Sequence, residues 1–327
     1  MSALRLGIIG AGGMAQQHMT VLAAMPGVEV CGIMSRTLPK AQALAQQFNV
    51  PVCVTTVKEL VEQAKPDALL VLVSVDQMFS VVKSVLPLRL PLFIEKPPAL
   101  SLPEAGELAR MAEEINIITM VGLNRRYYSI FHKGLQIIKD HGPLFGVHVE
   151  GHERFWQKRE NPNPKFSPQV MDKWIFANSI HTIDLVRFFG GDITSVHAAA
   201  RAYREAGGDQ FAAVMETDTG VIAQYQAFWY SPGGWRVVLY GNGATVEFKP
   251  LEKGTWMDNN FKSYDILPDV QDVDFKPGLL GQMQAFVKMV KTGHLEWPAQ
   301  DLQGAYKTMD LAQKLCAPLA KENTCGH

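Results

Sequence analysis

A lysine placed directly after an apolar run is the first side chain of this sequence that could do chemistry. Lys96 follows the run Pro91 to Glu95, within the motif Glu95-Lys96-Pro97-Pro98. At the carboxyl end of a strand beside a nucleotide, its ammonium would polarise a substrate oxygen or stabilise an alkoxide during hydride transfer. A solvated lysine paired with Glu95 would give the same motif. The motif alone therefore leaves a catalytic and a surface interpretation open.

The nucleotide that such chemistry requires is predicted from the opening of the chain. Leu4 to Ile9 is typical of a buried strand, Gly10 and Gly12 follow it, and a helical pattern begins near Ala15. This is the order of dinucleotide-binding folds, in which the first glycine permits a sharp turn and the second leaves room for a pyrophosphate. A glycine turn that binds nothing fits this placement less well. The free N–H groups of the helix start would hold the anion, at the predicted contacts Gly10, Gly12, Gly13, Met14 and Ala15.

The end of the second predicted strand, Val28 to Met34, bears on the choice between NAD and NADP. An NAD site usually offers a carboxylate to the ribose 2′-hydroxyl there. This chain has Ser35, Arg36 and Thr37 instead, with Lys40 in the next turn. A 2′-phosphate carries up to about two negative charges, which a guanidinium and two hydroxyls would suit. The cofactor is therefore predicted to be NAD(P), with NADP favoured, although a merely basic surface loop would look the same.

An alternation of apolar runs and helical patterns predicts the elements that carry these residues. It extends from Leu4 to Gly122 and predicts a doubly wound parallel sheet, which binds its ligand at the carboxyl ends of the strands where the strand order reverses. Ser74, Glu95 and Lys96 follow the fourth and fifth runs and complete the predicted cofactor contacts. We therefore expect an α/β fold in which residues 1–122 form an NAD(P)-binding Rossmann domain.

The pattern changes from Leu123 onward. We expect a strand from Val147 to Phe155, a helix from about Val170 to Phe189, and then period-two segments joined by hairpin turns. Residues 123–327 are predicted to form an α+β domain for substrate binding and oligomerisation, with a largely antiparallel, open-faced sheet. Its final helices are candidates to pack back toward the N-terminal domain.

An uncovered face of this sheet favours self-association. Phe228, Tyr230 and Trp235 are predicted to lie on that face, and large exposed apolar side chains often mark an interface between copies. We expect a homodimer or homotetramer.

The composition excludes several classes of partner. The 327 residues carry 31 basic and 32 acidic side chains, which gives no reason to expect nucleic acid or a membrane surface as a partner. The 4 cysteines show no metal-ligand spacing, so no metal is expected. We expect no signal peptide, because the first apolar run already predicts a strand, and no apolar run reaches membrane-spanning length. Reduced cysteines are expected in a cytoplasmic protein.

Several motifs, taken in order along the chain, resemble the glucose–fructose oxidoreductase/inositol dehydrogenase/rhizopine-catabolism (Gfo/Idh/MocA) family. The resemblance covers nearly the whole chain. It rests on the glycine turn, His18, Glu95-Lys96-Pro97, the segment from Val121 to Tyr127, His181-Thr-Ile-Asp184, and the segment from Gln284 to Gly293.

The resemblance implies an NAD(P)-dependent oxidoreductase that acts on a sugar, cyclitol or related polyol. Lys96 would orient and polarise the substrate oxygen, and His181 would exchange the hydroxyl proton, a role that the near-neutral pKa of histidine suits. Asp184 lies one helical turn further on and would fix the imidazole or bind a hydroxyl. A buried core histidine remains the alternative for His181. Relatives often have a cis peptide before the proline of this motif, which predicts a cis Lys96-Pro97 bond.

Four further residues are candidates to contact the substrate. Asn124 and Arg126 follow the last predicted strand of the first domain, and Arg126 would equally well tie the two domains together. Asn178 is the polar residue closest before His181, and Trp156 opens the loop that precedes the histidine-bearing helix. That loop would form part of the substrate wall or be an ordinary solvated loop.

The chain departs from the family pattern at two points. Ala177 stands where dehydrogenases of the family commonly have an aspartate, four residues before the histidine, and Ser74-Val75-Asp76 replaces a common Thr-Pro-Asn. A sensor or regulatory protein of the same fold that binds nucleotide and sugar without turnover is therefore the alternative to an enzyme.

Overall fold

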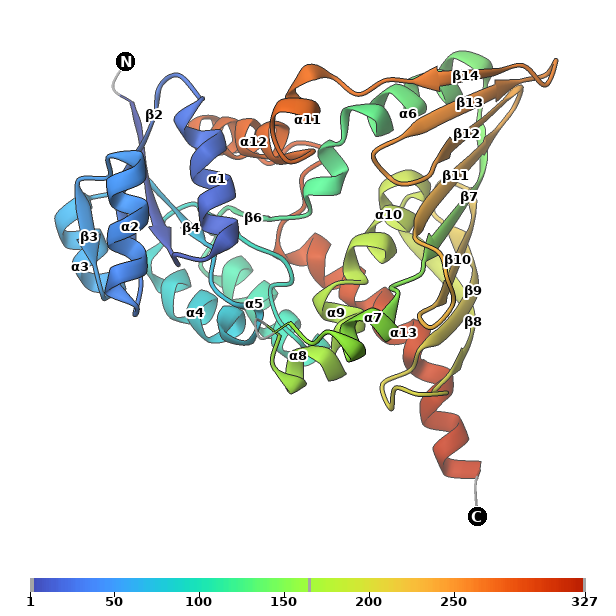
Figure 1. Ribbon diagram of the computed structural model, residues 1–327, viewed down its shortest axis with the longest axis horizontal. Coiled ribbons are helices and arrows are strands. Elements are labelled where there is room, and N and C mark those ends of the chain that lie inside the picture. Colours follow the sequence, from blue (N-terminus) through green and yellow to red (C-terminus); the bar gives the residue numbers. More distant parts are fainter. Residues whose placement is uncertain (1–2, 164–165, 326–327) are drawn as a thin grey trace. The chain divides into compact units, whose positions relative to one another are not determined.

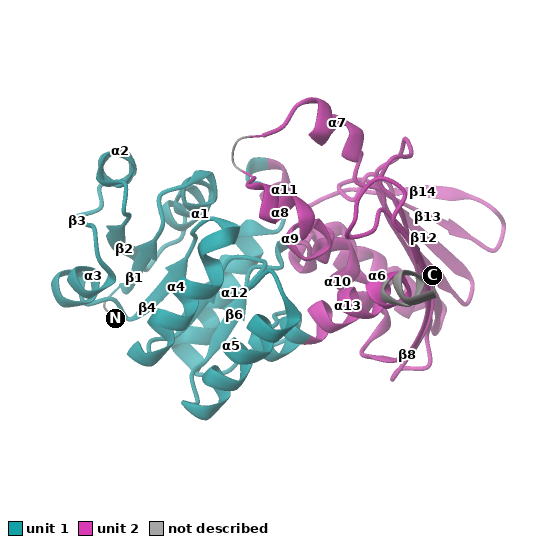
Figure 2. Cartoon of the chain, turned by 90° about the horizontal axis from the view of Figure 1, so that it is seen from below, with its two compact units in different colours: residues 1–124, 274–306 teal, residues 125–273, 307–327 magenta. Residues whose placement is uncertain are grey.

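The computed structural model describes residues 3–163 and 166–325, and the chain divides into two compact units (Figures 1 and 2). Unit 1 consists of residues 1–124 and 274–306, and unit 2 of residues 125–273 and 307–327. The observed boundary at residue 124 lies next to the predicted one at residue 122. Residues 274–306, which the sequence analysis places in the second domain, belong to unit 1.

Unit 1 is built on a six-stranded sheet with the strand order β3-β2-β1-β4-β5-β6. Every neighbouring pair is parallel. The order reverses between β1 and β4, which is where doubly wound sheets bind their ligands. The predicted Rossmann-type α/β fold is confirmed. The strands are β1 (Leu4–Ile9), β2 (Val28–Met34), β3 (Val52–Val54), β4 (Ala68–Val71), β5 (Leu92–Ile94) and β6 (Thr119–Val121).

The apolar runs of these strands reflect burial on both faces of the sheet. Leu6, Ile8 and Leu70 are fully buried, as expected where helices cover both sides of a parallel sheet. Local signals set the starts of two helices: Thr56 and Glu59 form a capping box, and the Ser101 hydroxyl accepts a hydrogen bond from the Glu104 N–H. The helices are α1 (Gly13–Ala23), α2 (Leu38–Phe48), α3 (Val57–Ala64), α4 (Met78–Val85), α5 (Leu102–Glu114) and α12 (Leu279–Thr292).

Long-range contacts bring residues 274–306 into unit 1. Phe286 of α12 packs edge-on against Phe93 of β5, with 5.5 Å between the ring centroids. The Val121 N–H donates to the Gln300 carbonyl at 2.7 Å, and the Leu302 N–H donates to the Thr119 hydroxyl at 3.2 Å. These contacts use β5 and the edge strand β6.

Unit 2 is built on an eight-stranded sheet with the order β14-β13-β12-β11-β7-β10-β9-β8. The pairs are antiparallel except β7 with β10, which is parallel. The predicted largely antiparallel sheet is therefore confirmed. The strands are β7 (Leu144–Gly151), β8 (Ile193–Arg201), β9 (Gln210–Thr217), β10 (Ile222–Phe228), β11 (Trp235–Gly241), β12 (Ala244–Phe248), β13 (Gly254–Asp258) and β14 (Ser263–Ile266).

Helices cover one face of this sheet and leave the other open (Figure 1). Phe131 of α6 (Ser129–His141) packs on Phe248 with 4.7 Å between ring centroids, and α10 (Ile180–Gly190) contacts β7 and β10. Along β9, Met215 is buried and Val214 is 48% exposed. This alternation separates the covered face from the open one.

The prediction that Trp235 lies on the open face is wrong. Trp235 shares its side of β11 with the buried Val237, and its ring centroid is 6.0 Å from that of His181. Tyr230 lies beyond the end of β10, where its hydroxyl contacts Glu205. Of the three, only Phe228 shares its side of the strand with the exposed side chains of β10, Ile222 and Gln224, and so faces the open side. The period-two alternation holds along β11, but alternation alone does not say which of the two faces the helices cover.

The segment before α10 also differs from the prediction. The single helix expected over residues 170–189 is three helices, and the strand expected to reach Phe155 ends at Gly151. The break before α10 falls at Asn178, whose backbone is not helical, and β7 turns away at Arg154, whose φ is +51°. The short helices are α7 (Phe155–Glu160), α8 (Pro168–Asp172) and α9 (Trp174–Ala177).

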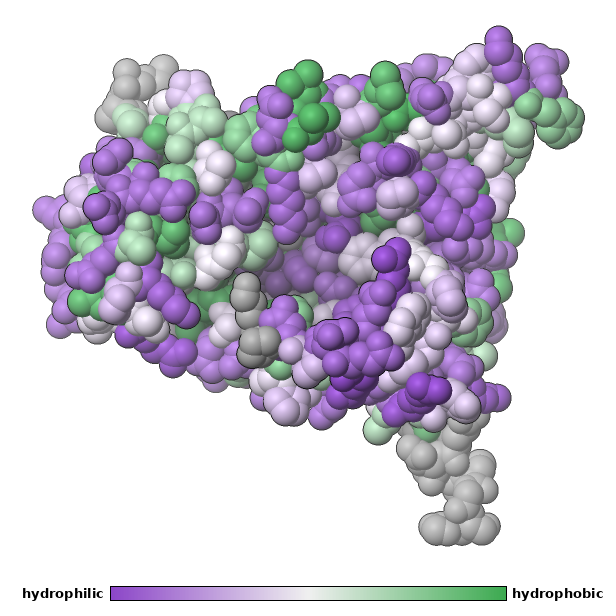
Figure 3. Space-filling view, in the orientation of Figure 1, coloured by the Kyte–Doolittle hydropathy of each residue, from purple (hydrophilic) through white to green (hydrophobic). Residues whose placement is uncertain are grey.

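Two helices complete the chain. α11 (Val270–Asp274) exposes Val270 and Val273, and on the face drawn in Figure 3 hydrophobic side chains gather over this helix. α13 (Leu302–Cys325) starts in unit 1 and continues in unit 2. No helix among the described residues is long and apolar enough to cross a membrane.

Candidate active site

The glycine turn between β1 and α1 has the geometry that a bound pyrophosphate requires. Gly10 has a φ of +115°, and a Cβ there would lie 2.4 Å from the carbonyl oxygen of Leu72. At Gly12 and Gly13, in contrast, an added Cβ would meet no atom within 4 Å. Gly12 is the N-cap of α1 and supplies no side-chain cap, and the first turn contains no acidic residue. The helix start therefore presents open backbone N–H groups and the positive end of a helix dipole to an anion.

A groove of about 210 Å³ runs from this turn along the carboxyl ends of β2 and β4. It brings together Gly10 and Gly12 with most of the residues predicted for the other end of the cofactor. Gly13, Met14, Ala15, Glu95 and Lys96 do not line it, and Ala15 is fully buried, as close packing of α1 on the sheet requires. The predicted residues that line the groove are Ser35, Arg36, Thr37, Lys40 and Ser74.

A carboxylate interacts electrostatically with the predicted phosphate-binding arginine. The Ser74 hydroxyl is the main cause that lowers the pKa of Asp76, and the Gln77 amide and the Arg36 guanidinium lower it further. Asp76 therefore stays ionised and shares part of the charge of Arg36. The sequence analysis treats Asp76 only as a departure from the family pattern and does not connect it with Arg36.

The Glu95-Lys96-Pro97 segment is fixed by Glu95. This carboxylate is 7% exposed, accepts a hydrogen bond from the Lys96 backbone N–H at 2.5 Å, and lies 3.6 Å from Nε2 of His18. His18 is fully buried and packs edge-on against Phe93. The cis Lys96-Pro97 bond is confirmed. One Glu95 oxygen thus binds the backbone that presents Lys96, and the other faces His18 of α1.

In unit 2, His181 lies at the start of α10 among aromatic side chains. It is the second residue of that helix and is 6% exposed. Trp235 lies beside it, and the Arg125 guanidinium stacks over the Trp235 ring at 4.4 Å from the centroid. Arg125 therefore covers one face of the Trp235 ring beside the imidazole, in a cation–π contact.

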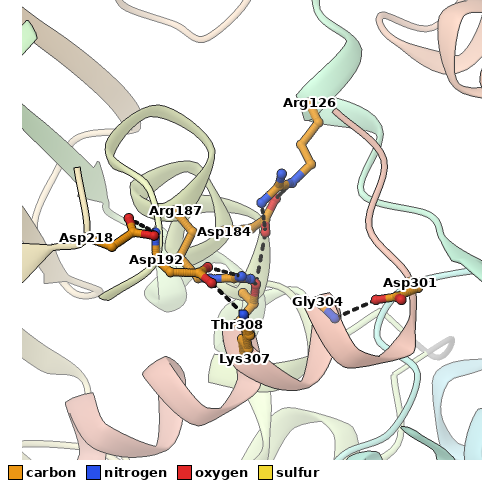
Figure 4. A network of polar contacts seen from close by, with 9 residues as sticks. All are labelled: Arg126, Asp184, Arg187, Asp192, Asp218, Asp301, Gly304, Lys307 and Thr308. Carbon is orange, nitrogen blue, oxygen red and sulfur yellow. Dashed lines mark hydrogen bonds and ion pairs between the residues drawn. The ribbon is translucent and has the colours of Figure 1, made fainter. Parts of the chain in front are cut away.

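Asp184 and Arg126 are each other's partners. Arg126 Nε and Nη2 donate to the two Asp184 oxygens at 2.6 and 2.8 Å, and both residues are 2% exposed. The Thr308 hydroxyl donates to Asp184 at 2.9 Å and accepts from Arg187 at 2.6 Å, and Arg187 in turn donates to Asp192 (Figure 4). This buried network anchors the helix that carries His181.

The remaining predicted substrate residues have varied settings. Asn124 is 5% exposed and its amide donates to the Pro277 carbonyl within unit 1. Asn178 is half-buried and its amide donates to Glu153 at 2.9 Å. Trp156 is half-buried in α7.

The sequence analysis missed Glu153 and Thr308. Glu153 is 4% exposed and also accepts from the Ser179 hydroxyl at 2.8 Å. Its local signal is only that of a charged residue after a strand, and Thr308 lies in an ordinary amphipathic helix. Only the tertiary contacts distinguish them.

Two structural features define the class of protein. The glycine turn is open at the start of α1, and the groove lies where the strand order reverses. These features define the class as Rossmann-type dinucleotide-binding proteins. In the described part of the chain, no group of three or more His, Cys, Asp or Glu side chains suited to a metal occurs. Residues 4–123 match the family description "Oxidoreductase family, NAD-binding Rossmann fold", and residues 141–247 match "GFO/IDH/MocA C-terminal domain". The protein belongs to the Gfo/Idh/MocA family.

Known relatives cover nearly the whole chain. The scyllo-inositol 2-dehydrogenase (NAD(+)) of Bacillus subtilis is 23% identical over 89% of this chain and 87% of its own. The myo-inositol 2-dehydrogenase of Thermotoga maritima is 21% identical over 89% of both chains. An oxidoreductase from Agrobacterium radiobacter, solved in complex with NAD+, L-tartaric acid and magnesium, has a TM-score of 0.80 at 18% identity and covers 98% of this chain and 97% of its own. The last likeness shows a shared fold.

Proposed function

We propose that this protein is a dehydrogenase that transfers a hydride between C4 of NAD(P) and a carbinol or carbonyl carbon of a sugar, cyclitol or related polyol. The observation that carries the proposal is the open space at Gly12 and Gly13 at the start of α1. Family membership and the inositol dehydrogenases among the relatives support the substrate class. The bound nicotinamide supplies the hydride acceptor or donor.

Two side chains of the protein are proposed to act on the substrate. Lys96, held by the Glu95 contact to its backbone, polarises the substrate oxygen and orients it. His181 accepts the hydroxyl proton during oxidation and returns it during reduction. Asn124, Asn178 and Trp156 remain candidate contacts of the substrate. Because Asp184 and Arg126 bind each other, we propose that Asp184 serves catalysis by anchoring α10.

Turnover and cofactor binding together test this function. Sugars, cyclitols and their keto forms should produce an absorbance change of the nicotinamide with the wild-type protein. The Lys96→Ala variant should lose turnover while its Kd for the cofactor stays near that of the wild type. Retained turnover in this variant removes Lys96 from the mechanism. Tight cofactor binding without turnover on any polyol would instead support a non-catalytic binding protein.

We further propose a preference for NADP(H) within the NAD(P) site. Arg36, Ser35, Thr37 and Lys40 line the groove beyond the glycine turn, and hydroxyls with a guanidinium suit a 2′-phosphate. Asp76 opposes this preference because it shares the charge of Arg36. The measurement is the ratio of the dissociation constants of NADH and NADPH, and tighter binding of NADH would reverse the assignment.

We also propose that the open face of the unit 2 sheet joins two or more copies of the chain. Ile222 and Tyr240 flank Gly146 in one row of this face and are 56% and 43% exposed. Small side chains such as Ala199 and Ala212 pair in another row, which would allow close approach of a second sheet. Light scattering at micromolar concentration should show a dimer or tetramer, and a monomer would contradict the proposal.

A cytoplasmic location is proposed from the cysteines. Cys31, Cys53 and Cys316 are free thiols, which is typical of a reducing compartment. Localisation of a tagged full-length chain by fractionation tests this.

A further inference from the structure

A buried carboxylate close in space to the start of the His181 helix has no role in the function proposed so far. Glu153 follows β7 and is 4% exposed. Its Oε1 accepts from the Ser179 hydroxyl at 2.8 Å, and its Oε2 accepts from Asn178 Nδ2 at 2.9 Å. Lys158 Nζ lies 3.6 Å from Oε2. Burying a carboxylate is costly, and hydrogen bonds with a paired cation are what make it tolerable.

The backbone directly after Glu153 adopts a strained conformation. Arg154, the next residue, has a φ of +51°, in the left-handed region that residues other than glycine seldom adopt. The Phe155 N–H then donates to the Trp229 carbonyl at 2.7 Å, and the Phe155 ring stacks on Trp229. Local strain of this kind persists where the surroundings over-determine it, often at functional sites.

Ser179, one of the two residues that donate to Glu153 at the start of α10, departs from the usual N-cap hydrogen bonding. Ser179 occupies the N-cap position of α10, but its side chain makes no capping hydrogen bond to the helix. Its hydroxyl donates instead to Glu153. A serine at an N-cap normally accepts from a helix N–H, so the contact with Glu153 replaces a stabilising local contact with a tertiary one.

The same contact fixes the orientation of the Asn178 amide. Asn178 Nδ2 donates to Glu153 Oε2, so the Asn178 Oδ1 points to the other side of the amide. The Asn178 backbone carbonyl accepts from the His181 N–H at 3.1 Å. Asn178 is therefore coupled on one side to Glu153 and on the other to the backbone of His181.

We infer that Glu153 is a positioning residue for the dehydrogenase reaction: it holds the Asn178 amide so that Oδ1 accepts a hydrogen bond from a substrate hydroxyl while His181 exchanges the proton. The inference rests on the proposed function. Lys158 balances the charge of Glu153. Its ammonium lies over the Trp174 ring at 5.1 Å from the centroid, and burial lowers its pKa while Glu153 opposes that effect.

Three variants test this role. Glu153→Ala removes both contacts to the helix start. Glu153→Gln keeps an acceptor for Asn178 Nδ2 and can donate to the Ser179 oxygen, so it is the conservative variant. Glu205→Ala is the matched control. Glu205 binds Arg159, the neighbour of Lys158 in the short helix α7, just as Glu153 pairs with Lys158, but it makes no described contact with Asn178 or Ser179.

The full-length protein with saturating cofactor is assayed with the polyol that the wild type turns over best. We expect Glu153→Ala to lower kcat at least tenfold and to change the pH profile of kcat, with the Kd for NAD(P)H within twofold of the wild type. Glu153→Gln should recover much of the loss, and Glu205→Ala should stay within threefold of the wild type. Equal kcat values for Glu153→Ala and Glu205→Ala would overturn the inference.

A second readout does not depend on turnover. The side-chain amide protons of Asn178, assigned by their loss in Asn178→Ser, should exchange slowly with solvent in the wild type and quickly in Glu153→Ala. Unchanged exchange overturns the inference even if the wild type is active. If the wild type turns over no polyol, the proposed function fails. Protected amide protons would then demonstrate the Glu153–Asn178 contact alone, and the role in catalysis would fail with the proposed function. If Glu153→Ala does not fold, the comparison passes to Asn178→Ser, which removes the amide that Glu153 holds: a kcat at least tenfold below that of Glu205→Ala supports the role, and equality refutes it.

Discussion

Replacing Gly12 by alanine should separate cofactor binding from folding. An added Cβ at Gly12 meets no protein atom within 4 Å, and the residue has a φ of −91°, which alanine adopts without strain. The stability of the free protein should therefore change by no more than about 1 kcal/mol, the scale of an N-cap or glycine substitution.

The same methyl group would occupy the space that a pyrophosphate needs. Losing two hydrogen bonds from backbone N–H groups to phosphate, at about 1.5 kcal/mol each, amounts to about 3 kcal/mol, or roughly a 100-fold weaker Kd. Gly10→Ala is the contrast: its φ of +115° and the 2.4 Å approach to the Leu72 oxygen predict a loss of about 2–6 kcal/mol of stability.

The assay is a fluorescence or calorimetric titration with NADH and NADPH, combined with thermal unfolding of the free protein. Gly12→Ala should bind about 100-fold more weakly with a nearly unchanged Tm. Binding within threefold of the wild type would show that no pyrophosphate lies against Gly12, and the dinucleotide site would be refuted. A Tm as low as that of Gly10→Ala would show that the turn has a different geometry.

Three further predictions follow from individual contacts. Asp184→Asn leaves Arg126 buried without its anion and should lower the free energy of unfolding by about 3–5 kcal/mol; urea unfolding measures this, and a loss below 1 kcal/mol would contradict the anchoring role. Arg36→Ala should weaken NADPH binding at least tenfold more than NADH binding, and equal effects in titrations would remove Arg36 from the 2′-phosphate site. Contacts with Arg159 and Tyr230 outweigh burial and lower the pKa of Glu205 below 4.5. The stability from this carboxylate is thus present above pH 4.5 and is lost as the pH falls through the lower folded-state pKa. Glu205→Gln should flatten the acid side of a plot of Tm against pH, and an unchanged slope would show that the contact is not populated.

Local patterns were enough to predict the parallel sheet of unit 1. Buried parallel strands are continuous apolar runs, and the glycine turn has a steric cause that is visible in the sequence, as the Cβ distances at Gly10 show. The cis Lys96-Pro97 bond followed from the resemblance to the family. Residues 274–306 could not be assigned to this unit in the same way, because their contacts, such as Phe286 with Phe93, join positions far apart in the chain.

In unit 2, sequence patterns predicted the residues of the site but not their partners. The sequence pointed to His181 and to the residues around it, but the bidentate pairing of Arg126 with Asp184 and the contact of Glu153 with Asn178 are long-range. Trp235 was assigned to the wrong face because the alternation of a strand gives two faces without saying which one the helices cover.

By itself, the sequence determined the parallel nucleotide-binding sheet, the glycine turn and the family, because each depends on the order and size of neighbouring residues. The tertiary structure alone decided which charged side chains are buried and what they bind. The reason is physical: a buried charge is stable only with a partner brought from another segment, as Thr308 is brought to Asp184, and no local pattern names that segment.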